Sequence, residues 1–95
     1  MIGGDYSEFL DHLYYGDELW IKYKGVVYFI EGWYEDSKCT IQCSLVTKQS
    51  LKLLYEISAG SMLDCAKKFL KQPLFEGKNL PEIEQETEWV DTELG

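Results

Sequence analysis

The residue types that could carry covalent or metal chemistry are few in this chain of 95 residues. Its cysteines are Cys39, Cys43 and Cys65, and its single histidine is His12. A nucleophilic site needs a base beside a serine or cysteine, and a zinc site needs closely spaced Cys and His ligands. The C-x-x-x-C spacing and the distant histidine meet neither requirement. We therefore expect reduced thiols, no bound metal and no cofactor, as in a cytoplasmic protein.

Sequence motifs of enzymes are also missing. The chain has no G-x-S-x-G nucleophile elbow, no Walker phosphate loop and no G-x-G-x-x-G loop. It holds 17 Asp and Glu residues, so a glycosidase-like spacing of two carboxylates arises by chance. All nine basic residues are lysines, and without arginine the usual clamp for phosphate and carboxylate groups is absent. We predict that the protein is not an enzyme.

The net charge of −8 belongs to the two ends of the chain. Residues 1–20 hold five acids and no lysine, residues 21–75 hold five acids and eight lysines, and residues 76–95 hold seven acids and one lysine. This balance argues against nucleic acid or an anionic membrane as a partner, because both need clustered cations. The C-terminal acids form either a solubilising tail or a surface complementary to a basic protein. The candidate binding residues there are Glu82, Glu84, Glu86, Glu88 and Asp91.

Local patterns predict a single α+β domain spanning residues 1–95. Capping residues and apolar spacing indicate helices over about 6–15 and from Met62 to about residue 70, and a short acidic helix over about 80–86 with an extended segment after it. Between the helices, alternating apolar residues predict a four-stranded antiparallel meander. The fourth strand, over 51–57, could also be helical. No stretch approaches the ~20 apolar residues that a membrane span needs.

The predicted hairpin at residues 19–34 is apolar on both faces. A two-residue turn at Lys24-Gly25 pairs Tyr23 with Val26, which places Trp20 and Trp33 together on one face. That face is either covered by a helix or by the C-terminal segment, or it binds a protein through aromatic anchors. We name Trp20, Trp33 and Trp89 as candidate anchors, Trp89 because a purely solvated acidic tail has little use for a tryptophan. A sugar- or base-stacking platform is the weaker alternative.

Two stretches carry a resemblance to a known group of proteins. They are the run YFIEGWYE at residues 28–35 and the segment from KFL at 68–70 through PLFEGKNL at 73–80 to EWVD at 88–91. Together they resemble short acidic proteins of Gram-positive bacteria that look like immunity proteins encoded beside polymorphic toxins, including those of contact-dependent growth inhibition. The resemblance implies a cytoplasmic protein that neutralises a toxin by binding it, and it transfers no catalytic residue.

The sequence therefore favours a non-enzymatic inhibitor that covers the active site or substrate cleft of a basic toxin such as a nuclease. We expect it to be a monomer when free, or a weak homodimer. The first alternative is an adaptor or structural subunit of a bacterial or phage assembly that uses the same aromatic patch. The second is a small-molecule binding domain or enzyme, which requires a deep polar pocket between sheet and helices.

Overall fold

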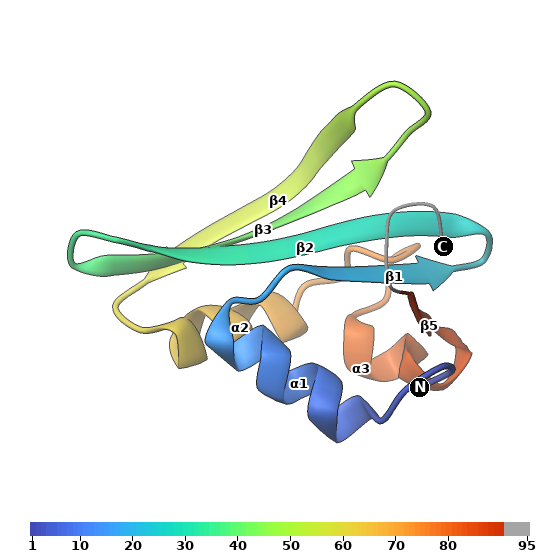
Figure 1. Cartoon of the computed structure of the whole chain (residues 1–95), viewed down its shortest axis with the longest axis horizontal. Helices are drawn as coiled ribbons and strands as arrows, with labels where there is room; N and C mark the ends of the chain where they lie inside the picture. Colours follow the sequence, from blue (N-terminus) through green and yellow to red (C-terminus); the bar gives the residue numbers. More distant parts are fainter. Residues whose placement is uncertain (91–95) are drawn as a thin grey trace.

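A computed structural model describes residues 1–90, and it has the predicted α+β fold (Figure 1). The predicted site residue Asp91 lies outside the described residues. One antiparallel sheet has the strand order β4-β3-β2-β1-β5. The strands are β1 (Leu19–Tyr23), β2 (Val26–Glu35), β3 (Lys38–Val46), β4 (Leu51–Ala59) and β5 (Glu88–Val90). The helices are α1 (Tyr6–Tyr15), α2 (Met62–Leu70), α3 (Leu80–Ile83) and the 3₁₀ turn η1 (Glu84–Glu86).

Each α-helix begins at a polar cap that the sequence signals. Asp5 accepts a hydrogen bond from the Ser7 backbone N–H at 2.8 Å, and Ser61 accepts one from Asp64 at 3.1 Å. Asn79 and Glu82 form a reciprocal capping box at the start of α3. These bonds satisfy backbone donors that the first turn of a helix leaves unpaired. The predicted helix starts are confirmed for this local reason.

The meander also follows the predicted register. Tyr23 pairs with Val26 across the Lys24-Gly25 turn, and Lys24 adopts a positive φ of 50° there. Residues 51–59 form strand β4 rather than a helix, and a bulge interrupts their pairing with β3 after Cys43. The bulge places Leu53 opposite Ser44, on the face that carries Phe29. The uncertain fourth strand is therefore a strand, irregular at one point.

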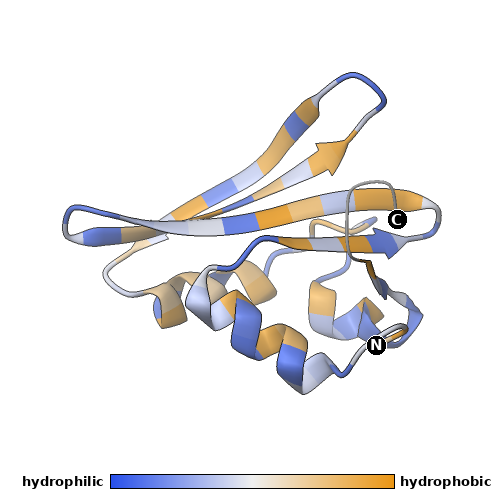
Figure 2. Cartoon of the chain, viewed as in Figure 1, coloured by the Kyte–Doolittle hydropathy of each residue, from blue (hydrophilic) through white to orange (hydrophobic). Residues whose placement is uncertain are grey.

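All the helices lie on one face of the sheet (Figure 1). That face and the helices share a core that is dry at its centre, since Phe9, Ile30, Ile41 and Cys65 are fully buried. The possibility that helices cover both faces is wrong for residues 1–90, because α1, α2 and α3 all pack on the same side. Figure 2 shows that apolar residues also mark β2 and the outer end of the β3–β4 hairpin. The second face of the sheet, called here the open face, is thus partly apolar without a helix over it.

The three cysteines belong to the helix-covered core. Cys39, Cys43 and Cys65 are all buried and unbridged, and the Cys65 thiol donates a hydrogen bond to the Cys39 carbonyl with a sulfur–oxygen distance of 3.0 Å. Burial raises the pKa of Cys43 to about 12. A thiol with so high a pKa holds little thiolate near neutral pH, so it is a packing residue rather than a nucleophile.

Candidate functional site

The two acidic ends of the sequence come together in space. The backbone N–H of Ile2 donates to Thr87 at 2.9 Å, and the N–H of Trp89 donates to Ile2 at 2.8 Å. The amino group of Met1 lies 2.9 Å from a carboxylate oxygen of Glu84. The segment before α1 therefore runs beside the segment from η1 to β5 (Figure 1).

An aromatic contact joins the same two segments on the helix side. The ring of Trp89 meets Phe9 edge-on with 5.4 Å between centroids, and His12 at 5.6 Å. Phe9 is fully buried, whereas Trp89 is only half-buried and keeps part of its indole at the surface. Trp89 is thus both a core contact of α1 and a surface aromatic between the two acidic segments.

Exposed carboxylates gather around this junction and form what we call the acidic surface. No lysine occurs in residues 1–21 or 79–90, so nothing on these segments neutralises it except the Met1 amino group and His12. His12 and Asp17 form a pair at 2.6 Å. The exposed acids of the acidic surface are Asp5, Glu8, Asp11, Asp17, Glu82 and Glu86.

The four described glutamates predicted to bind a partner have different local roles. Glu82 closes the α3 capping box by accepting from the Asn79 N–H at 2.9 Å, and Glu84 is half-buried against the Met1 amino group. Glu88 is half-buried in β5. Only Glu86 is exposed and, within residues 1–90, has neither a hydrogen bond nor an ion pair through its side chain. Glu86 is therefore the clearest candidate for contact with a partner.

The acidic surface has one internal titration marker. Partial burial, together with the nearby Glu84 carboxylate, raises the pKa of Tyr6 to about 12 from its ordinary 10.0. The unfolded chain releases this phenol proton first, so the contribution of Tyr6 to folding is complete below pH 10 and is lost as pH rises toward 12.

We therefore predict that Tyr6→Phe removes part of the alkaline loss of stability. Between about pH 10 and pH 12, the free energy of unfolding of the variant should fall less steeply than that of the wild type, because phenylalanine has no proton to release. Urea titrations at a series of pH values measure this slope. Tyr15→Phe, which changes an exposed tyrosine of the same helix, should leave it unchanged, and equal slopes for wild type and Tyr6→Phe would contradict the assignment.

The predicted tryptophan anchors do not form one surface with these acids. Trp20 stacks on Phe29 with 4.7 Å between ring centroids on the open face, and Trp33 lies further along the same face beside Glu35. Trp89 points to the other face, because it pairs with the core residue Ile21 of β1. The hairpin register thus brings Trp20 and Trp33 to one face, as predicted, and separates both from Trp89.

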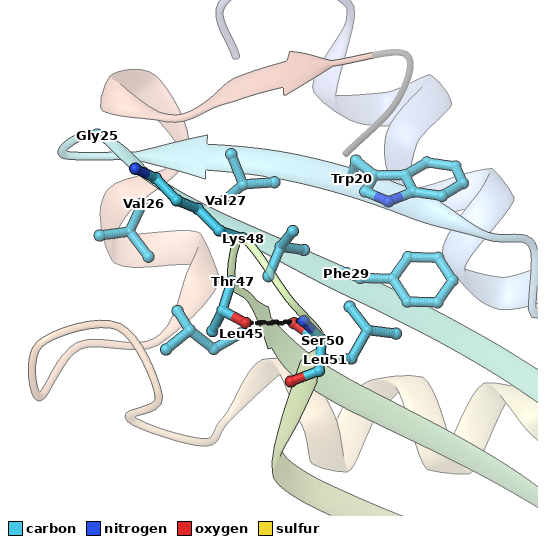
Figure 3. Close-up of a pocket in the computed structure, with 11 residues that line it drawn as sticks. Trp20, Gly25, Val26, Val27, Phe29, Leu45, Thr47, Lys48, Ser50 and Leu51 are labelled. Carbon is cyan, nitrogen blue, oxygen red and sulfur yellow. Dashed lines mark hydrogen bonds between the residues drawn. The ribbon is translucent and has the colours of Figure 1, made fainter. Parts of the chain in front are cut away.

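A groove on the open face was not predicted from the sequence. The β3–β4 hairpin rises away from β2 and leaves a space of about 970 Å³ between them (Figure 3). The hairpin turn is held by Thr47, whose hydroxyl donates to the Ser50 carbonyl at 2.7 Å. The signal in the sequence was the run Leu51, Leu53 and Leu54, which breaks strict alternation. Apolar side chains dominate the lining: Trp20, Val26, Val27, Phe29, Leu45, Val46 and Leu51.

The open face also carries charge in an ordered arrangement. Extending the β1–β2 register by one residue places Glu18 opposite Glu31, and the two carboxylates repel each other. Partial burial and the charge of Glu18 raise the pKa of Glu31. Lys22, opposite Val27, lies on the other side of the Trp20–Phe29 pair. The aromatic pair is thus flanked by one cation and two anions.

Other kinds of site find no support in the part of the chain that the structure describes. Among residues 1–90, no three His, Cys, Asp or Glu side chains are grouped to hold a metal ion. None of the described helices is long and apolar enough to cross a membrane. The acidic surface and the open face are therefore the two features that could bind something.

No protein-family model, no curated protein and no solved structure significantly matches this chain. The function is accordingly argued from the two surfaces.

Proposed function

We propose that the protein is a non-enzymatic inhibitor that binds a basic partner protein. Most concretely, it is a cytoplasmic immunity protein that neutralises a toxin, such as a nuclease, by occluding its active site or substrate cleft. The observation that carries this proposal is the junction of the two acidic segments through Met1–Glu84 and the Ile2 backbone bonds. Segments that are remote in sequence thereby contribute to one continuous region of negative charge.

The physical role of such a surface is recognition of a cationic cleft. A basic cleft that normally binds phosphates attracts clustered carboxylates, and the summed field accelerates the encounter of the two proteins. Glu86 and Asp11 are free for this role, since neither side chain is bonded to residues 1–90. The half-buried Trp89 supplies an apolar anchor at the centre, where aromatic residues contribute most to binding energy.

Growth of cells that produce both proteins tests the proposal. The partner to use is the C-terminal domain of a secreted multidomain protein encoded beside this chain. We expect that wild-type protein restores growth and that the double variant Asp11→Lys/Glu86→Lys protects poorly. The matched control is Glu35→Lys/Glu56→Lys, which changes net charge equally but lies away from the acidic surface. Equal protection by both variants, or no protection by the wild type, would refute the proposal.

An adaptor subunit of a larger assembly is the second candidate. The apolar groove and the exposed Leu51, Leu53 and Leu54 favour it, because permanent interfaces are more apolar than transient ones. Such a subunit should be recovered from its native host in a stable complex that includes no toxin. The acidic surface would then be dispensable, and the Asp11→Lys/Glu86→Lys variant would assemble like the wild type.

A further inference from the structure

Along the β1–β2 ladder, the open face has charges arranged symmetrically about an aromatic centre. The centre is the stacked pair Trp20–Phe29. Lys22 lies two residues from Trp20 in one direction, and Glu31 lies two residues from Phe29 in the other. Positions two apart on a strand are separated by about 6.6–6.8 Å. The lysine and the carboxylate are therefore at similar distances from the centre, on opposite sides of it.

These charges lack close partners within the domain. No lysine, histidine or amino-terminal nitrogen of residues 1–90 lies within 4.0 Å of Glu18 or Glu31, and no carboxylate of the same residues lies that close to Lys22, although Glu88 occupies the position opposite it on β5. Like charges directly opposite each other weaken a sheet. A cation brought from outside would relieve the repulsion between Glu18 and Glu31.

We propose that the open face binds a second copy of this chain. The two sheets pack face to face across a two-fold axis that passes over the Trp20–Phe29 pairs, with the β2 strands antiparallel. Because such an axis exchanges the two ends of the ladder, Lys22 of each copy lies over Glu31 and Glu18 of the other. The contact is isologous, so each charge pair forms twice.

The groove provides the apolar part of this contact. Val27 and Val46 line it beside the aromatic pair, and Leu51 and Leu53 of the β3–β4 hairpin are 51% and 52% exposed. A second sheet packed on this face covers them. A standard interface buries about 800 Å² of each partner, a modest part of the 5653 Å² of this domain. With a net charge of −8 opposing association, we expect a weak dimer, with a dissociation constant on the order of 10 μM.

Pairing through the edge strand β4 is the competing geometry for two copies, and its own features disfavour it. The bulge beside Leu54 breaks the regular ladder that another strand would need. Lys52 adds a charge to the same edge, and both devices are known to prevent edge-to-edge association. The face therefore provides the better contact.

Sedimentation equilibrium of the full chain from about 1 μM to about 1 mM tests the proposal. The wild type should dimerise, and Lys22→Glu or Glu31→Lys alone should weaken the dimer about tenfold or more, because each places like charges together. The combined Lys22→Glu/Glu31→Lys variant should return to within about threefold of the wild type. Trp20→Ala should also weaken the dimer at least about tenfold.

Leu63→Glu is the control, since Leu63 is 45% exposed on α2, in the opposite layer. It should leave the dissociation constant unchanged, and circular dichroism should show every variant folded. A protein that stays monomeric throughout the range overturns the proposal, as does a dimer that Lys22→Glu and Glu31→Lys leave intact. The measurement uses the protein alone, so its outcome is independent of whether the acidic surface binds a toxin.

Discussion

Replacing Phe9 with alanine should lower the free energy of unfolding by about 3–5 kcal/mol, the usual cost of removing a fully buried phenylalanine. Phe9 is 0% exposed and supports Trp89 through an edge-on contact at 5.4 Å. Its loss leaves a cavity between α1 and β5, which are the two elements that hold the acidic segments together. Urea unfolding followed by circular dichroism gives the free energy, and the red shift of Trp89 emission reports the local loss of packing.

Tyr15→Ala is the matched control for this substitution. Tyr15 belongs to the same helix but is 73% exposed, so its removal should change stability by no more than about 0.5 kcal/mol. If Phe9→Ala costs no more than Tyr15→Ala, then α1 is not held to β5 by this contact. The account of how the acidic surface is assembled would then be wrong.

The second large effect is expected at Gly32, where α1 ends against β2. A methyl group at Gly32 would lie 3.0 Å from the Cα of Gly16 and 3.1 Å from the end of Met62. The Gly32 N–H also donates to the Gly16 carbonyl at 3.2 Å, so the two backbones cannot separate freely. Gly32→Ala should therefore destabilise the fold by about 1–3 kcal/mol, although the same change in an unobstructed strand gains about 0.5–1 kcal/mol.

Thermal unfolding measures this effect, since 1 kcal/mol corresponds to about 4–8 °C in Tm for a domain of this size. Gly60→Ala is the control, because no atom lies within 4 Å of a methyl group placed there. It should be neutral or slightly stabilising. A Gly32→Ala protein that melts at or above the wild-type temperature would show that the close approach of α1 to β2 does not limit this position.

Much of the fold could be predicted because its signals are local. The caps at Asp5, Ser61 and Asn79 mark helix starts through hydrogen bonds to backbone only two or three residues away. The Lys24-Gly25 turn fixes the hairpin register in the same way. Strand β4 was harder to assign, because its bulge interrupts the alternation that identifies a strand.

The placement of the elements could not be predicted, since it depends on contacts between distant residues. The approach of Gly16 to Gly32 and the packing of Phe9 on Trp89 help to put α1 on the side of the sheet shared by all the helices, which leaves Trp20 uncovered by them. The bond from Ile2 to Thr87 likewise joins segments more than 80 residues apart. For this reason the sequence indicated acids at both ends but not that they meet, and it placed Trp89 with tryptophans that lie on the other face.

The rate of association with the toxin domain tests the proposed role of the acidic surface most directly. Stopped-flow fluorescence at low and physiological salt should show a fast association for the wild type that slows as salt increases. In Asp11→Lys/Glu86→Lys, the association rate constant at low salt should fall about tenfold or more and depend less on salt. In the control Glu35→Lys/Glu56→Lys, the same change in net charge should lower it by less than about threefold. Equal rate constants for the two double variants would contradict the proposal that the joined acidic segments recognise the partner.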